Sequence, residues 1–190
     1  MPQKAPTPLN PLPPLPEHRL NVLISEDEIQ RRIDELAQEI STDLRDKDPV
    51  IIGVLKGAFV FVADFCRRLD FPNTIDFIRV SSYPNSVVTS GEVKLELDLA
   101  HSVANRHLLL LEDIIDTGLT LQYLKASLGV RNPASLRVCS LLHKPDNNVK
   151  LSTIDYIGFS IPNKFVVGYG LDYRGYYRNL PYIAQIEEVQ

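Results

Sequence analysis

The sequence predicts an α/β domain built on a mostly parallel central sheet with helices on both faces. Apolar runs of strand length occur at 49–55 and 108–111, and a mostly apolar one at 136–142, which is typical of strands that are buried on both faces of a sheet. Stretches with the apolar spacing of helices separate these runs. Buried strands that alternate with helices along the chain are the pattern of a doubly wound fold.

The expected elements follow one another from residue 25. Ser25 and Glu28 have the spacing of a capping box, and apolar residues then recur on one helical face from Ile29 to Leu44. Alternating apolar and polar residues over 93–99 predict a half-buried strand. The remaining predictions are helices over 58–69 and 119–128, and strands over 49–55, 75–80, 108–111, 136–142, 154–159 and 165–169.

Length and composition predict one globular domain and exclude several classes of protein. The chain has 190 residues and a net charge of −4, which argues against a general nucleic-acid binder. No apolar run approaches the roughly 18 residues that span a membrane, and the first residues do not resemble a secretory signal. We therefore expect a cytoplasmic protein without nucleic-acid or membrane partners. Cys66 and Cys139 lie among apolar residues and are interpreted as buried thiols.

Residues 1–16 are predicted to form a proline-rich tail in front of a single domain over residues 17–190. Half of the 14 prolines of the chain lie in this tail, and proline favours an extended backbone that cannot join a helix or a central strand. The tail could dock on a proline-binding groove of another protein. We expect instead an unstructured segment or one that lies along the surface.

The segment from Leu108 to Thr120 carries the strongest chemical signal. An apolar strand runs into two adjacent carboxylates, a third carboxylate follows at Asp116, and Thr117-Gly118-Leu119-Thr120 opens a helix. Ligands of open parallel sheets bind at the carboxyl ends of the strands, where loop amides and a helix N-terminus suit a phosphate. Carboxylates tolerate a nearby phosphate when sugar hydroxyls and Mg²⁺ lie between them. The pattern therefore predicts a site for a phosphorylated sugar.

Residues 112–120 resemble the phosphoribosyl pyrophosphate (PRPP) motif of type I phosphoribosyltransferases. The resemblance to their hypoxanthine-guanine branch runs from about residue 22 to 185, and its four motifs occur in the family's order, at 55–57, 82–92, 112–120 and 144–172. It implies the type I phosphoribosyltransferase fold, with a small hood and a flexible loop. It further implies a purine salvage enzyme that transfers the 5-phosphoribosyl group of PRPP to N9 of hypoxanthine or guanine. Mg²⁺ would be the cofactor, and the chain would form a homodimer or homotetramer.

The resemblance also implies a role for each residue that matches a family motif. The ribose and 5′-phosphate of PRPP would be bound by Glu112, Asp113, Ile115, Asp116, Thr117, Gly118, Leu119 and Thr120. Pyrophosphate would be bound by Leu55, Lys56, Gly57, Ser82, Tyr83 and Arg178, with an unusual cis peptide between Leu55 and Lys56. The purine would contact Lys144, Phe165, Val166 and Asp172, and the metal Glu112, Asp113 and Asp172. Asp116 is the expected catalytic base, acting at N7 of the purine.

Three of these features have a second interpretation from the residues alone. Phe165, taken by its pattern, would be a core residue, and only the motif around it favours a lid on the purine. The polar stretch 81–91 is either a lid that excludes water or a floppy hairpin, and Pro84 within it restricts the hinge. His143, beside Lys144, is interpreted as a bystander because no partner for it is evident.

Two other functions are compatible with such a fold. One is a non-catalytic regulator that keeps the PRPP pocket as a sensor, and the other is a transferase that prefers xanthine. Asp116, Lys144 and Phe165 are all present, which favours a working transferase over a sensor.

Overall fold

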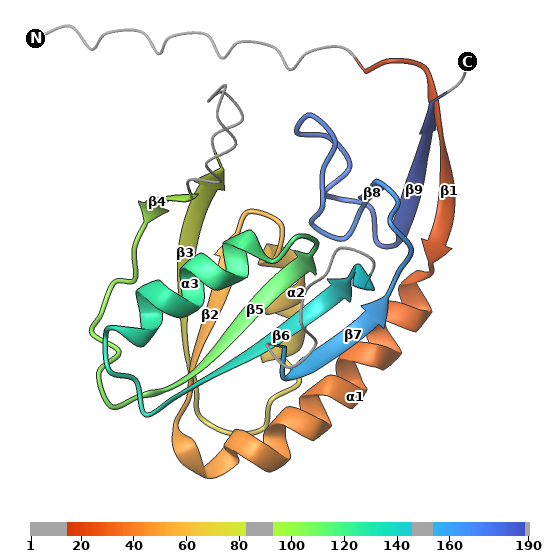
Figure 1. Ribbon diagram of the computed structural model, residues 1–190. Coiled ribbons are helices and arrows are strands. Elements are labelled where there is room, and N and C mark those ends of the chain that lie inside the picture. Colours follow the sequence, from red (N-terminus) through yellow and green to blue (C-terminus); the bar gives the residue numbers. More distant parts are fainter. Residues whose placement is uncertain (1–14, 83–92, 146–153, 189–190) are drawn as a thin grey trace, which may run out of the picture.

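Two sheets of different size organise the molecule (Figure 1). The computed structural model describes residues 15–82, 93–145 and 154–188. The larger sheet has the strand order β4-β3-β2-β5-β6-β7 and the smaller one the order β1-β9-β8. The strands of the larger sheet are β2 (Val50–Leu55), β3 (Thr74–Ser82), β4 (Val93–Leu97), β5 (His107–Ile115), β6 (Ser135–His143) and β7 (Tyr156–Ser160). Those of the smaller sheet, called the hood below, are β1 (His18–Ile24), β8 (Val166–Val167) and β9 (Ile183–Glu188).

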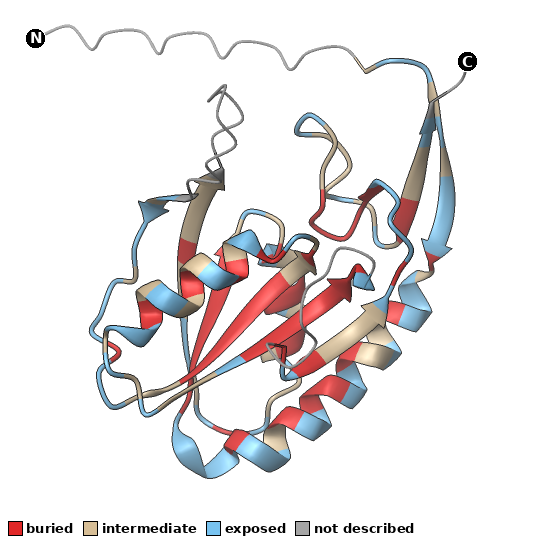
Figure 2. Ribbon diagram, in the orientation of Figure 1, coloured by how far each residue is buried: buried red, intermediate tan, exposed pale blue. Residues whose placement is uncertain are grey.

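The predicted mostly parallel sheet with helices on both faces is confirmed. Strands β3, β2, β5, β6 and β7 run parallel, and only β4 pairs antiparallel, at one edge. Helices α1 (Glu26–Leu44) and α2 (Phe59–Cys66) contribute to one apolar cluster, and α3 (Leu119–Gly129) contributes to the other. Alternate residues of β5 enter the two clusters, so the strand is buried from both sides, as Figure 2 shows for the central strands.

Helix α1 forms where the capping box predicts it. The Glu28 amide donates to Ser25 Oγ at 3.4 Å, and the Ser25 amide donates to the Glu28 carboxylate at 2.9 Å. The residues that the helical periodicity predicts to be buried are all buried, namely Ile29, Ile33, Leu36, Ala37, Ile40 and Leu44. A 3₁₀ turn, η1 (Arg45–Lys47), follows. Among the described residues, no helix combines the length and apolar character needed to cross a membrane.

The hood differs most from the sequence prediction. Within residues 15–188, as far as they are described, regular structure begins at His18 and not at Ser25, because β1 pairs antiparallel with β9, and neither strand was expected. Most of β1 is exposed, including Val22 at 59%, so the strand lacks the alternating apolar pattern that would reveal it. The strand expected over 165–169 shrinks to β8, because Gly168 adopts a φ of +96° and ends the extended backbone.

Candidate functional site

The register of the central sheet brings Asp116 and Lys144 together. Ile115, the last residue of β5, is paired with His143, the last residue of β6. The next residue of each strand therefore emerges at the same level, and the Lys144 amide donates to the Ile115 carbonyl at 3.0 Å. The Lys144 Nζ lies 3.1 Å from Asp116 Oδ2. Lys144 is buried and Asp116 is partly exposed, so the Asp116 side of the charged pair is accessible from solvent.

Residues from three of the sequence motifs line one cavity of about 310 Å³ at this edge of the sheet. A smaller cavity of about 90 Å³ adjoins it and shares Ile114 and Asp116. The larger cavity is lined by Lys56, Gly57, Asp113, Ile114, Asp116, Lys144, Phe165, Val166, Leu171, Asp172 and Arg178. The smaller is lined by Glu112, Ile114, Ile115, Asp116, Thr117, Gly118, Thr120 and Leu121.

The loop in front of α3 is suited to an anion. Gly118 adopts a left-handed φ of +75° as the N-cap residue, a conformation that costs glycine little. As a glycine, the N-cap residue has no side chain to cap the first amides of α3, so these amides are suited to a ligand. Thr117 and Thr120 add hydroxyl groups at the smaller cavity. The amides at a helix N-terminus, together with these hydroxyl groups, have the chemistry of a phosphate site.

Glu112 and Asp113 are acids held in an environment that disfavours their charge. Burial raises the pKa of Glu112 well above its usual range, and the nearby charge of Asp113 raises it further. Burial likewise raises the pKa of Asp113 to about 6, while backbone amides and Arg178 oppose the rise and Asp172 adds to it. A bound cation or a set of hydroxyl donors would stabilise both carboxylates in their charged forms.

The segment after β2 packs tightly against Asp113. The Leu55–Lys56 peptide is cis, and a Cβ atom added to Gly57 would overlap Asp113 Oδ2. A Cβ atom on Gly170 would in turn overlap the Gly57 carbonyl oxygen. The three segments that carry Gly57, Asp113 and Gly170 thus meet at one point, which sets the position of Lys56 on the cavity wall.

Arg178 is held by two acceptors at the cavity. Its Nη2 atom lies 2.5 Å from Asp172 Oδ1, and its Nη1 atom donates to the Gly170 carbonyl at 2.6 Å. The other carboxylate oxygen of Asp172 accepts from the Gly175 amide at 2.7 Å. Within the part of the chain that the structure describes, no group of three or more His, Cys, Asp or Glu side chains could hold a metal ion by itself. The metal role of Glu112, Asp113 and Asp172 stays a prediction.

The hood supplies the remaining wall of the cavity. Phe165 is 55% exposed there, so the core interpretation of this residue is wrong. Val166 is buried in β8. Ser82 is the last residue of β3, whereas Tyr83, Pro84 and the predicted lid lie outside the described residues from 83 to 92. Our sequence reasoning gave no role to Ile114 and Leu171, which line the cavity; as apolar residues beside motif acids they could have been suspected.

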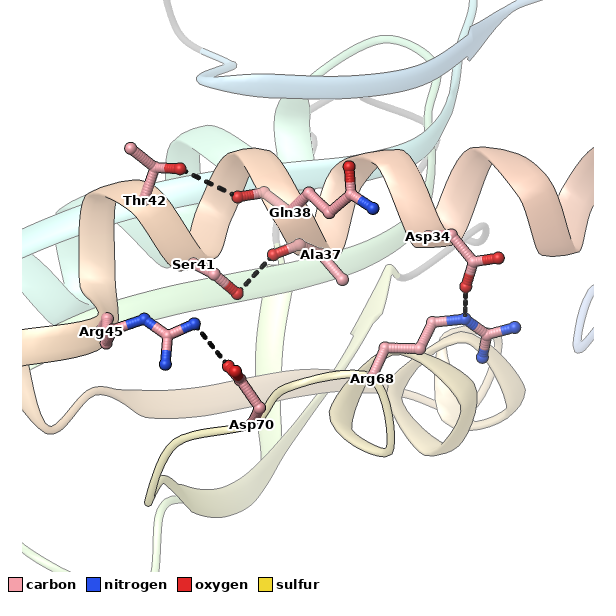
Figure 3. Close-up of a pocket in the computed structure, with 8 residues that line it drawn as sticks. All are labelled: Asp34, Ala37, Gln38, Ser41, Thr42, Arg45, Arg68 and Asp70. Atoms are coloured by element: carbon pink, nitrogen blue, oxygen red, sulfur yellow. Dashed lines mark hydrogen bonds and ion pairs between the residues drawn. The ribbon is translucent and has the colours of Figure 1, made fainter.

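A cavity of about 520 Å³ along α1 and the segment after α2 is a poor alternative site (Figure 3). Its charged groups are already paired with one another. Arg45 lies 2.6 Å from Asp70, and Arg68 is bonded to Asp34. A ligand would have to displace these pairs, so the sheet edge remains the candidate site.

Known proteins resemble this chain over most of its length. The family model described as "Phosphoribosyl transferase domain" matches residues 25–174. The hypoxanthine-guanine phosphoribosyltransferase of Bacillus subtilis is 49% identical over 166 residues, which are 87% of this chain and 92% of that protein. The hypoxanthine phosphoribosyltransferase of Escherichia coli is 42% identical over 172 residues, 90% of this chain and 97% of that protein.

A solved structure agrees in fold over most of the chain. The crystal structure of a hypoxanthine-guanine phosphoribosyltransferase from Bacillus anthracis, with a HEPES molecule in its active site, has a TM-score of 0.84 to this chain. The two are 45% identical, and the match covers 90% of this chain and 100% of the other.

Proposed function

The chain belongs to the hypoxanthine-guanine branch of the phosphoribosyltransferase family, and on that premise we propose that it transfers the 5-phosphoribosyl group of PRPP to N9 of hypoxanthine or guanine. The products are IMP or GMP and pyrophosphate. The observation that carries the proposal is the Asp116–Lys144 pair, at the common end of two parallel strands, in one cavity with Phe165. In a 6-oxopurine, Asp116 offers a hydrogen-bond acceptor to N7, and Lys144 offers a fixed cation to the oxygen at C6.

The proton of the base passes to Asp116. N7 of the purine donates to the Asp116 carboxylate, while Lys144 donates to the oxygen at C6 and Phe165 covers the ring. Asp116 lines both cavities, which supports a position between the base and the ribose. Positive charge develops on the sugar as its bond to pyrophosphate breaks, and the carboxylates at this edge stabilise that charge electrostatically.

The phosphate groups of PRPP occupy the two ends of the site. The 5′-phosphate lies on the amides and hydroxyls of the loop from Asp116 to Thr120. Pyrophosphate lies against Lys56, Gly57 and Arg178, which line the larger cavity and supply two positive charges. Ser82 and Tyr83 are proposed to bind pyrophosphate, and the loop that they begin is proposed to act as the lid.

We further propose that the reaction depends on Mg²⁺. Asp113 and Asp172 face one cavity and Glu112 the adjoining one, and carboxylate oxygens are the ligands that Mg²⁺ takes. The ion usually binds through one or two carboxylates plus substrate phosphates, so Asp113 and Asp172 would hold it together with the phosphates of PRPP. Bound Mg²⁺ would neutralise charge on the diphosphate.

The assembly and location follow the family expectation. We propose a homodimer or homotetramer in the cytoplasm. An apolar groove of about 640 Å³ between α2 and β3 supports the assembly, because Phe59 and Ile75 are 43% and 49% exposed there. A two-fold axis through this face would bury the same groove of both copies. Light scattering on Phe59→Glu should give a smaller species than wild type, and an unchanged mass would exclude this face.

The test of the activity is a product assay with PRPP, Mg²⁺ and each of hypoxanthine, guanine, xanthine, adenine and uracil. Turnover with hypoxanthine or guanine is expected, and it should stop when EDTA is added and resume with excess Mg²⁺. The Asp116→Asn variant is the matched control for contaminating activity. Turnover with xanthine alone would favour the xanthine transferase, and PRPP binding without any turnover would favour the sensor.

A further inference from the structure

A line of aromatic side chains joins the first strand of the hood to the cavity. The Phe165 ring meets the Tyr173 ring edge-on, with centroids 5.5 Å apart. Tyr173 in turn contacts the His18 imidazole, with centroids 6.2 Å apart, and the Arg174 guanidinium lies 5.3 Å from the Tyr173 ring. Phe165 is the only member of this line that belongs to the larger cavity as lined by the described residues. Tyr173, His18 and Arg174 are not among the described residues that line this cavity.

His18 is fixed from both of its ring nitrogens. Nδ1 is within hydrogen-bond distance of the Pro16 carbonyl, and Nε2 lies 2.6 Å from the Tyr177 hydroxyl. A carbonyl can only accept, so Nδ1 carries the hydrogen, and in the neutral ring Nε2 then accepts from Tyr177. The Tyr177 ring also packs edge-on against the imidazole, at 5.5 Å. A half-buried side chain with this many partners has little freedom to turn.

The backbone makes the same connection by a second route. The Ile186 amide of β9 donates to the Phe165 carbonyl at 3.1 Å, and Ile186 is paired with Leu20 of β1. The strand that carries His18 therefore supports both the backbone and the ring of Phe165. Figure 1 shows β1 and β9 side by side at the outer side of the hood.

We propose that His18 and Tyr173 are positioning residues for the purine, acting through the ring of Phe165. This inference rests on the proposed function, in which Phe165 covers the base. Neither residue touches the cavity. Their role is to hold an otherwise exposed ring at the angle at which the base can stack on it. Affinity for the base would then depend on the N-terminal strand, whereas affinity for PRPP, bound at the sheet edge, would not.

The experiment compares the KM for hypoxanthine with the KM for PRPP in full-length variants. Tyr173→Leu removes the ring that contacts Phe165 and should raise the hypoxanthine KM by about three- to tenfold, the scale of one lost aromatic pair. Tyr173→Phe keeps the ring and should restore the wild-type value. His18→Ala should raise the hypoxanthine KM by about two- to fivefold. The PRPP KM should stay within about twofold of wild type in all three.

A double variant separates positioning from general loss of structure. If His18 acts through Tyr173, His18→Ala combined with Tyr173→Leu should bind hypoxanthine no worse than Tyr173→Leu alone. Val22→Ala, on the exposed face of the same strand, is the control for β1 and should leave both KM values unchanged. The proposal would be overturned if the two substitutions raised the hypoxanthine KM by factors that multiply in the double variant. An equal rise in the PRPP KM would also overturn it. So would failure of Tyr173→Phe to restore affinity.

Failure of the proposed function would give a different result. Wild type would then turn over neither hypoxanthine nor guanine. In an active enzyme, Phe165→Leu must raise the hypoxanthine KM, and in that background Tyr173→Leu should have no further effect. A separate effect of Tyr173→Leu without the Phe165 ring would show that Tyr173 acts elsewhere, and would overturn the relay through Phe165.

Discussion

The two halves of the site are built in different ways. At the sheet edge, Asp116 and Lys144 come from the ends of two parallel strands whose register fixes their positions. In the hood, Phe165 precedes a strand of two residues and depends on contacts from β9 and from Tyr173. The first half is held by the core of the molecule, the second by a small sheet with much of its surface exposed. Chemistry and base affinity should therefore respond to different substitutions.

The largest effect should come from Asp116→Asn. The asparagine can still accept a hydrogen bond from Lys144 but cannot take a proton, so kcat should fall by about 10²–10⁴-fold. The KM for PRPP should change little, because the loop amides remain. Asp27→Asn, an exposed substitution of the same kind on α1, should be silent. Turnover close to wild type in Asp116→Asn would remove this residue from the proton transfer and weaken the contrast between the halves.

Lys144→Gln tests how the sheet edge binds the base. It keeps a donor for the oxygen at C6 but loses the charge, so the KM for hypoxanthine should rise about tenfold, the scale of one charge-assisted hydrogen bond. The exposed Lys47→Gln is the matched control. A collapse of PRPP affinity with an unchanged hypoxanthine KM would instead place Lys144 at the phosphate end.

The pH dependence of stability tests the sheet edge without any substrate. The pKa of Asp113 is raised to about 6 from about 3.9 in an unfolded chain, so between these values the folded state binds more protons. The free energy of unfolding therefore falls as pH rises from about 4 to 6 and stays lower above 6. Asp113→Asn removes this pH-dependent decrease in the free energy of unfolding. In Mg²⁺-free buffer its Tm at pH 8 should exceed that of wild type by about 2–4 °C, which corresponds to about 1 kcal/mol.

The same comparison at low pH provides the control. Below about pH 4 the wild-type carboxyl is protonated in both states, so the difference in Tm should vanish. A Tm difference that is independent of pH would mean that Asp113→Asn acts through packing against Gly57 and not through its charge.

The smallest effect should follow from deleting residues 1–14. The deletion leaves Pro16, whose carbonyl accepts from His18, and all of β1. Tm should change by less than about 2 °C, and the KM for hypoxanthine should not change. A deletion that continues through residue 24 should raise that KM, because it removes His18. A large change from the shorter deletion would show that the tail itself supports the hood.

Sequence reasoning succeeded where a local pattern determines the structure. The apolar runs predicted the central strands, and the placement of Asp116 and Lys144 directly after two of them led to one site. The hood has no such pattern. Strand β1 exposes Val22 and Leu23 and exists because β9, more than 150 residues later in the chain, pairs with it. Exposure of Phe165 depends on this tertiary arrangement, so its own neighbours in sequence could not reveal it.

The contact between Gly57 and Asp113 has a consequence for inherited variation. Every amino-acid replacement of glycine introduces a Cβ atom, and at position 57 that atom would overlap the Asp113 carboxylate. Gly170 also lies close to the Gly57 carbonyl oxygen, since a Cβ atom at position 170 would overlap that oxygen. Any missense change in this codon, whatever its polarity or charge, would thus displace either the Asp113 carboxylate or the segment that carries Lys56, and substitution scales that grade replacements by chemical similarity would misjudge the position.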